Sequence, residues 1–206
     1  MQQLSVAAHN IRSMANVGAL FRTCDGAGAS ELILSGYTGT PPDRRISKVA
    51  LGAEEHVPWV HAPAPADLLQ VLEDRFVVLL EQHPDAVPPA GLELPAGRDV
   101  CIVACEELFG AEAQLIERAD AILELPMRGR KESLNVAMAT GIALYLAADL
   151  MWGTADGDLA SRQDRPPVRD GVLTRGVTTG PAPHRERVHA PAGVQRAPGG
   201  SQADTR

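Results

Sequence analysis

The sequence predicts an α/β domain in which helices cover both faces of a parallel sheet. Short stretches of nearly continuous aliphatic residues alternate along the chain with stretches whose apolar residues recur at helical spacing. The aliphatic stretches lack the polar–apolar alternation of a half-exposed strand, which is typical of parallel strands buried on both sides. The connections between the two kinds of stretch are short, and this favours βαβ units.

Five strands and four helices are expected in the first three quarters of the chain. Hydrophobic residues make up 45% of the sequence and aromatic residues 3%, so the core is expected to consist of Leu, Val, Ile and Ala. The expected strands are 4–8, 31–36, 76–81, 99–105 and 121–125. The expected helices are 16–27, 65–74, 112–119 and 133–150.

Residues that favour helix ends mark the boundaries of these elements. Asn16 and Ser133 are expected to be N-caps, because their side chains accept hydrogen bonds from free backbone N–H groups. Gly28 is expected to end the first helix, and Pro65 to begin the second. Residues 82–98 are rich in Pro and Gly and form a loop between two expected strands.

The chain is expected to fold as one domain, residues 1–152, followed by a disordered tail, residues 153–206. The tail is rich in Pro, Gly and Arg and shows no sustained periodicity. It contains too little apolar surface to offset the entropy lost on ordering.

The charge distribution limits how an anionic partner would be bound. The formal net charge of the whole chain is −7, which does not by itself indicate a nucleic-acid-binding protein. The tail contains eight Arg and six acidic residues, whereas residues 1–152 carry a balance of −9. An anionic partner therefore has to be bound by local basic clusters.

Several classes of protein are disfavoured. Cys24, Cys101 and Cys105 form no even disulfide framework and no zinc motif, so a reducing, cytoplasmic location is expected. The histidines form no metal-binding pattern with Cys or acidic residues, so no metal is expected. The longest apolar stretch, 141–152, contains Asp149 and is too short to span a bilayer, and the N-terminus has no signal-peptide pattern.

The first candidate motif lies in residues 9–34, where Asn16, Gly18 and Arg22 share one expected helix. The free N–H groups at the start of a helix attract anions, and a nearby glycine allows a ligand to approach the backbone. Arg22 follows Gly18 by about one helical turn and would add a planar cation over the same face. The motif is either a site for a phosphate or carboxylate, or a capped surface helix with an exposed arginine.

The second motif lies in residues 101–120, where an apolar strand continues into Glu106, Glu107 and Gly110. A strand, a glycine-containing turn and a helix often line a ligand crevice at the carboxyl end of a parallel sheet. The two carboxylates are either acid–base groups or solvated loop residues. Loop residues are the simpler interpretation, because neighbours in sequence rarely face each other.

The third motif lies in residues 125–145 and begins with a loop that contains Arg128, Arg130 and Lys131. Ser133 and Asn135 follow at the start of a long apolar helix. The motif either holds hydrogen-bonding groups beside a cationic loop, as a binding site would, or is a basic loop followed by a capped helix.

In this order, the three motifs resemble those of the SpoU family, also called TrmH-like RNA 2′-O-ribose methyltransferases, of the SPOUT superfamily. The family's Asn-x-Gly-x-x-x-Arg-Thr helix is matched by Asn16, Gly18, Arg22 and Thr23. Its aliphatic-Pro-Met loop and Ser-Leu-Asn element are matched by Leu125, Pro126, Met127, Ser133, Leu134 and Asn135. Residues 48–59 resemble its Gly-Ala-x-x-His-Val-Pro segment, and the likeness covers roughly residues 3–150.

The resemblance implies a SPOUT-type parallel sheet with helices on both faces, a deep trefoil knot in the C-terminal part of the domain, a homodimer and bound S-adenosyl-L-methionine. The implied cofactor contacts are Leu80, Cys105, Gly110, Leu125, Ser133 and Leu134. The family's second motif is Gly-x-Glu-x-x-Gly. Glu107 and Gly110 match it, but Cys105 stands at the first glycine, so the pocket is expected to be narrower.

The resemblance also implies transfer of a methyl group to a ribose 2′-hydroxyl of RNA, with tRNA expected ahead of rRNA. The implied catalytic residues are Arg22, Asn16, Ser133, Asn135 and Glu107. An arginine stays protonated at neutral pH and is therefore a poor general base, so Arg22 is expected to stabilise the developing oxyanion and to bind the phosphate. The expected RNA contacts are Arg12, Arg22, Arg44, Arg45, Lys48, Arg128, Arg130 and Lys131.

Two alternatives stay open at this point. One is a methyltransferase that acts on a base, although Arg22 together with the Ser-Leu-Asn element favours ribose. The other is a non-catalytic RNA-binding protein with the SPOUT fold, which is supported by Cys105 and by the −9 charge of residues 1–152.

Overall fold

The computed structural model describes residues 2–106, 109–153 and 178–179. The strands are β1 (Leu4–His9), β2 (Glu31–Ser35), β3 (Trp59–Ala62), β4 (Phe76–Leu80), β5 (Val100–Cys105), β6 (Ala121–Leu123) and β7 (Thr178–Thr179). The helices are α1 (Met14–Ala27), α2 (Arg44–Ala50), α3 (Pro65–Val71), α4 (Ala113–Arg118) and α5 (Val136–Trp152). Two short 3-10 helices, Ala53–Glu55 and Pro89–Gly91, complete the described secondary structure.

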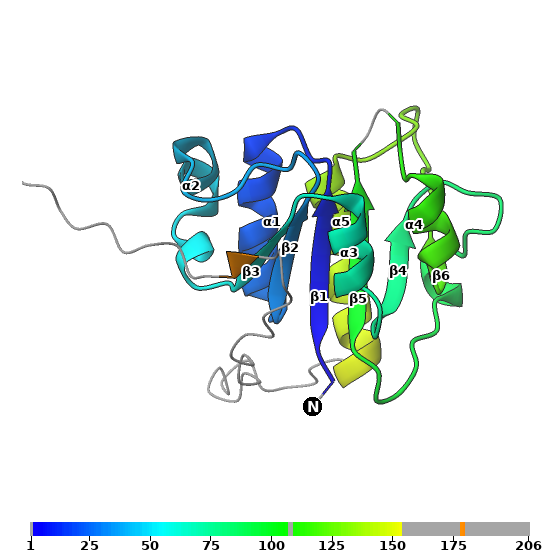
Figure 1. Cartoon of the computed structure of the whole chain (residues 1–206). Helices are drawn as coiled ribbons and strands as arrows, with labels where there is room; N and C mark the ends of the chain where they lie inside the picture. The colour runs from blue at the N-terminus through cyan, green and yellow to red at the C-terminus, as the bar shows by residue number, and fades with distance from the viewer. Residues whose placement is uncertain (1, 107–108, 154–177, 180–206) are drawn as a thin grey trace, which may run out of the picture.

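The strands form a single sheet in the order β6-β4-β5-β1-β2-β3-β7. Strands β1 to β6 are parallel to their neighbours, and β7 pairs antiparallel with β3. Figure 1 shows α1 and α5 on one face of the sheet and α3 and α4 on the other. The predicted parallel sheet with helices on both faces is therefore confirmed. The trefoil knot stays a prediction.

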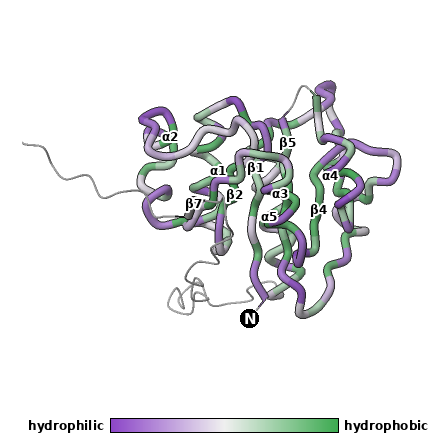
Figure 2. The backbone as a smooth tube through the Cα atoms, viewed as in Figure 1, coloured by the Kyte–Doolittle hydropathy of each residue, from purple (hydrophilic) through white to green (hydrophobic). Residues whose placement is uncertain are grey.

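Each face of the sheet has its own apolar core. In β2, Leu32 and Leu34 pack into the core on the α1 and α5 side, whereas Ile33 belongs to the core beneath α3 and α4. The same division of successive side chains is found in β5. Figure 2 shows β4 and β5 in the green of hydrophobic residues, in agreement with strands that are covered on both faces.

The five expected strands and four expected helices are present, but α2, β3 and β7 were not predicted. Helix α2 has seven residues, of which Ile46 and Ala50 are buried, and this is too few for a clear helical period. Strand β3 has four residues, and its apolar Trp59 and Val60 follow a proline. Of the expected tail, 153–206, the structure describes residue 153 and β7, so the predicted disorder lies outside the described residues.

Two helix starts differ from the prediction. The N-cap of α1 is Ser13, whose hydroxyl accepts a hydrogen bond from the Asn16 N–H at 3.3 Å. The N-cap of α5 is Asn135, whose side-chain oxygen accepts hydrogen bonds from two backbone N–H groups. Asn16 and Ser133 are therefore not N-caps. At each start a nearby polar side chain reaches the free N–H groups instead.

Gly18 serves the packing of two helices. It is buried, and a Cβ atom at this position would lie 2.6 Å from the Ile46 carbonyl oxygen and 2.9 Å from the Val49 Cβ of α2. Only glycine allows α2 to approach α1 this closely. The interpretation of Gly18 as a cleared surface for a ligand is wrong, because α2 occupies that space.

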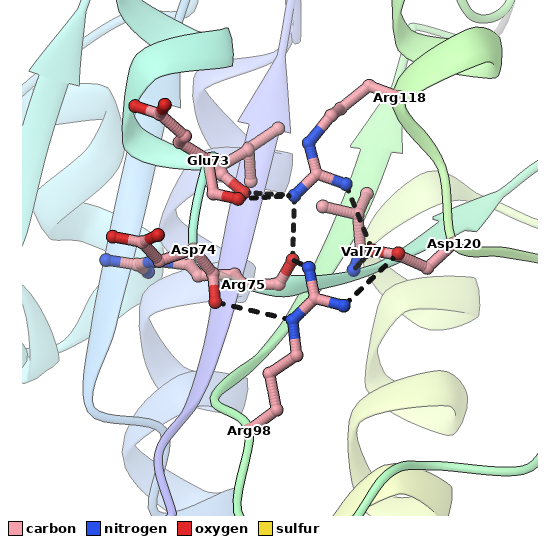
Figure 3. A network of polar contacts seen from close by, with 8 residues as sticks. Glu73, Asp74, Arg75, Val77, Arg98, Arg118 and Asp120 are labelled. Atoms are coloured by element: carbon pink, nitrogen blue, oxygen red, sulfur yellow. Dashed lines mark hydrogen bonds and ion pairs between the residues drawn. The ribbon is translucent and has the colours of Figure 1, made fainter.

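The amino ends of the strands are held by an arginine network (Figure 3). Arg118 donates hydrogen bonds to the carbonyl oxygens of Leu72, Glu73 and Arg75, and forms an ion pair with Asp120 at 3.0 Å. Arg98 forms an ion pair with the same carboxylate at 3.3 Å. These contacts bind the turn before β4 to the starts of β5 and β6.

The pKa of Asp120 lies below its ordinary value. Burial, the largest single influence, raises this pKa, but hydrogen bonds from the Val77 N–H and Arg118 and the charges of Arg98 and Arg118 together outweigh it. The carboxylate is therefore ionised at neutral pH and completes the network.

Candidate active site

A cavity of about 350 Å³ lies at the carboxyl ends of β4, β5 and β6. Because these strands are parallel, the segments that follow them meet at one edge of the sheet, where α/β proteins commonly bind ligands. The start of α5 closes the cavity through Leu134, Val136 and Ala139. The second and third sequence motifs therefore contribute to the same wall.

All six residues expected to contact a cofactor line this cavity. They are Leu80, Cys105, Gly110, Leu125, Ser133 and Leu134. Of the expected catalytic residues, Ser133 lines it as well. Glu107 lies outside the described residues. The neighbouring Glu106, the other carboxylate of the second motif, lines the cavity.

Glu81 fixes the loop that follows β5. Its carboxylate accepts hydrogen bonds from the Ala111 N–H at 2.8 Å and from the Gln82 N–H at 2.9 Å. A Cβ atom at Gly110 would lie 2.7 Å from a Glu81 oxygen, and the φ angle of Gly110 is +66°. The site therefore requires glycine at position 110 for two reasons, a left-handed backbone and the close approach of a carboxylate.

The third motif is held beside the end of β4 by one hydrogen bond. The Gln82 side chain donates a hydrogen bond to the Glu132 carbonyl oxygen at 2.6 Å. This contact fixes the segment that precedes Ser133 beside the end of β4.

Cys105 contributes a neutral thiol to the cavity wall. The residue is 7% exposed, and burial, followed by the charges of Glu81, Glu112 and Glu106, raises its pKa to about 12. The thiol therefore stays protonated at neutral pH and is a weak nucleophile. It adds volume where the family pattern has a glycine.

The first and third motifs are joined by one hydrogen bond. The Asn135 side-chain N–H donates to the Asn16 side-chain oxygen at 3.0 Å. Asn135 is also the N-cap of α5, so the same amide caps one helix and contacts the first turn of another. The contact connects two expected catalytic residues that are more than a hundred positions apart in the sequence.

Arg22 is exposed on α1 and forms no ion pair within the described part of the chain. The expected RNA-binding residues Arg44 and Lys48 of α2 are likewise exposed and have no ion-pair partner among the described residues. Arg45 differs, because it forms an ion pair with Asp43 at 2.7 Å. The loop cations Arg128, Arg130 and Lys131 are exposed beside the cavity and form no ion pair within the described ranges.

Arg12 connects the β1 end to the cavity wall. Its guanidinium lies 5.7 Å from the centre of the Tyr37 ring and donates a hydrogen bond to the Tyr37 hydroxyl at 3.3 Å. It also forms an ion pair with Glu106 at 3.5 Å. The contacts with Tyr37 and Glu106 raise the pKa of Arg12, which is charged in any case.

Sequence reasoning missed the cluster around His9. The imidazole is 2% exposed, and its nitrogens lie 3.0 Å from the Ser35 hydroxyl and 3.4 Å from the Glu112 carboxylate. Asn10 follows with a φ of 60° and contacts both His9 and the Tyr37 N–H. The signal was present in the sequence, since His9 and Asn10 stand directly after an expected strand, where sites of α/β proteins are found.

No cluster of three or more His, Cys, Asp or Glu side chains has a geometry that could hold a metal ion in the described part of the chain. Among the described helices, none combines the length and apolar character needed to cross a membrane.

Comparisons with known proteins agree with the motifs. The model of the SpoU rRNA Methylase family matches residues 3–145. The chain is 27% identical over 135 residues to the 23S rRNA (guanosine(2553)-2'-O)-methyltransferase RlmP of Bacillus subtilis, a match that covers 66% of this chain and 54% of that protein. The chain thus spans about half the length of this curated relative.

Solved structures show the same architecture. An AdoMet-bound rRNA methyltransferase from Sinorhizobium meliloti is 29% identical with a TM-score of 0.67, and the match covers 71% of this chain and 56% of that one. A TrmH/SpoU tRNA modifying enzyme from A. aeolicus is 26% identical with a TM-score of 0.63, over 73% of this chain and 76% of that one. The family model matches more than two thirds of this chain, and the chain therefore belongs to the SpoU rRNA methylase family.

Proposed function

We propose that the chain is an S-adenosyl-L-methionine-dependent methyltransferase that modifies a ribose 2′-hydroxyl of RNA. The observation that carries the proposal is the cavity at the carboxyl edge, where the six expected cofactor contacts meet. The Asn135–Asn16 hydrogen bond adds support, because it joins the cavity's helix to the helix that carries Arg22. Relatives named as RNA methyltransferases agree with this reaction.

The cavity fits the proposed cofactor in its chemistry. Apolar side chains such as Leu80, Leu123 and Leu125 suit the faces of an adenine ring. Glu106 has one carboxylate oxygen that is buried without a hydrogen-bond partner among the described residues, which suits a cationic group. When bound, the cofactor supplies an electrophilic methyl group on a sulfonium.

The protein's own residues would bind and orient the RNA. The fixed cation of Arg22 would hold the phosphate of the target nucleotide and stabilise negative charge that develops on the 2′-oxygen. Asn16 and Asn135 hold each other in place, and Ser133 presents a hydroxyl at the cavity wall. Exposed cations on α2 and in residues 128–131 would bind neighbouring phosphates, and this binding would weaken as salt rises.

An exposed apolar stripe on α5 supports a homodimer. Met138, Ile142 and Tyr145 are 65%, 49% and 51% exposed, and they follow one another at helical spacing. Leu134, in the cavity wall, continues the stripe, so a second copy packed there would also border the cavity. Replacing Ile142 with Glu should convert dimers into monomers in light-scattering measurements, whereas an unchanged mass would contradict this interface.

The identity of the RNA, the boundaries of the domain and the location of the protein belong to the same proposal. A preference for tRNA over rRNA remains the sequence-based expectation, although the curated relative above is named for 23S rRNA. One domain over residues 1–152, a disordered tail over 153–206 and a cytoplasmic location complete the proposal. Limited proteolysis that leaves residues 1–152 intact would support the division.

The test is transfer of labelled methyl groups from S-adenosyl-L-methionine to total tRNA and to rRNA. The wild type should transfer label to one of these RNAs, and digestion of that RNA should release the label as a 2′-O-methyl nucleotide. Arg22→Ala should lower the rate by about 10²–10³-fold, as expected when one oxyanion-stabilising group is lost. The rate of Arg22→Lys, which keeps the charge but loses the planar guanidinium, should lie between the rates of the wild type and Arg22→Ala.

Three outcomes would redirect the proposal. Label recovered on a base would identify a base methyltransferase. Unchanged turnover in a folded Arg22→Ala protein would remove Arg22 from the reaction. Absence of saturable S-adenosyl-L-methionine binding would favour a non-catalytic RNA-binding protein.

A further inference from the structure

We propose that the carboxylates of the cavity select the cationic cofactor, S-adenosyl-L-methionine, over its neutral product, S-adenosyl-L-homocysteine, and that Glu106 contributes most of this selectivity. The inference rests on the proposed function and adds a charge preference to it. The described residues that line the cavity include three carboxylates, Glu81, Glu106 and Glu124, and no Lys, Arg or His. The cavity wall is therefore negatively charged on balance.

The first two of these carboxylates differ in how far the protein already uses them. Both oxygens of Glu81 accept backbone hydrogen bonds, so this group supports the loop after β5. The Glu106 side chain is 10% exposed, and its Oε2 atom has no hydrogen-bond partner among the described residues. A buried carboxylate oxygen without a hydrogen bond is costly, and a cationic ligand in the cavity would reduce that cost.

Arg12 compensates the charge of Glu106 only in part. Its Nε atom is 3.5 Å from the Glu106 Oε2, but the arginine side chain is 62% exposed and lies against Tyr37 on the side of the solvent. The Cys105 thiol adds no charge, because burial and the nearby carboxylates raise its pKa to about 12. The negative charge of Glu106 is thus available to the cavity.

The proposed reaction changes the charge that faces these carboxylates. The S–CH3 bond breaks and its electron pair stays on sulfur, the O–CH3 bond forms, and the hydroxyl proton is lost to solvent. The sulfur centre changes from cationic to neutral. Attraction to the carboxylates is lost at this step, so product release is favoured and product inhibition is weak.

The test is calorimetric titration of the full chain, without RNA, with each of the two ligands. The wild type should bind S-adenosyl-L-methionine about tenfold more tightly, the effect of one charge pair at close range in a partly shielded site. Glu106→Gln should remove most of this difference in affinity, because it weakens the binding of S-adenosyl-L-methionine. The affinity for S-adenosyl-L-homocysteine should change by less than twofold. Glu117→Gln on α4 is the matched control, because it removes one exposed carboxylate that does not line the cavity, and it should change neither affinity.

The outcomes separate the inference from the proposed function. Equal affinity of the wild type for both ligands, or an equal loss for both in Glu106→Gln, would overturn the charge selection and leave the function standing. No binding of either ligand by the wild type would overturn the function as well. If Glu106→Gln does not fold, Glu124→Gln should show the same ligand-specific loss at about threefold, and no such loss would contradict the inference.

Discussion

The two edges of the sheet use their charged residues in opposite ways. At the amino edge, Arg98 and Arg118 are saturated by backbone carbonyl groups and by Asp120 (Figure 3). At the carboxyl edge, the cations of residues 128–131 have no ion-pair partner in the described ranges, and Glu106 has an oxygen without a hydrogen bond there.

This difference separates structural charges from candidate functional ones. A guanidinium that is already surrounded by acceptors has little capacity left for a ligand, and its loss exposes several unsatisfied groups. A charge that the fold leaves unsatisfied costs stability, and such costs are usually retained where a ligand binds. The number of arginines at an edge is therefore less informative than the number of their partners.

The largest expected effect on stability is at the amino edge. Arg118→Ala would remove the ion pair with Asp120 and the hydrogen bonds to the carbonyl oxygens of Leu72, Glu73 and Arg75. The Glu73 oxygen would lose its donor, whereas the Leu72 and Arg75 oxygens keep the Arg75 N–H and Arg98 as donors, so the free energy of unfolding should fall by about 2 kcal/mol. Urea denaturation monitored by circular dichroism measures this change. Arg130→Ala, at the carboxyl edge, is the control and should stay within about 0.5 kcal/mol of the wild type. Similar losses in the two variants would break the comparison.

A smaller effect is expected where α5 begins. Asn135→Ala removes the N-cap and the contact with Asn16, and should cost about 1 kcal/mol of unfolding free energy. Ser133→Ala should cost much less, because Ser133 is exposed and caps no helix. Both variants should be compared by thermal unfolding. A larger loss of stability in Ser133→Ala than in Asn135→Ala would indicate that Ser133 is the N-cap of α5.

The smallest expected effect is a pH dependence at the amino edge. Because the pKa of Asp120 is lowered in the folded state, its contribution is present above the unfolded-state pKa and is lost as the pH falls through the folded-state value. Asp120→Asn should cost up to about 1 kcal/mol at pH 7, since the partly exposed carboxylate is screened by solvent. The difference from wild type should shrink below about pH 4 in urea titrations. A difference that does not change with pH would mean that shape, not charge, is lost.

The fold could be predicted wherever the sequence pattern was long enough. Apolar stretches such as 100–105, within the expected strand 99–105, predicted parallel strands, because burial on both faces leaves little place for polar side chains. The seven residues of α2 and the four of β3 were too short for a period to emerge. The glycine of the first motif was correctly identified as special, but its neighbour, α2, was not foreseen, so its role was misjudged.

By itself, the sequence determined the order along the chain of the longer strands and helices. It also determined three motifs and a family resemblance that places the residues of these motifs in one site. Tertiary structure alone decided which of these residues meet. The parallel sheet brings Leu80, Cys105 and Leu125 to one edge, and the hydrogen bond between Asn16 and Asn135 forms only because α1 and α5 pack on the same face. Tertiary structure also decided that Glu106 is buried in the cavity wall while the arginines at the opposite edge are saturated. Local sequence fixes the conformation of neighbouring residues, whereas burial and the partners of a charge depend on segments that are distant in the chain.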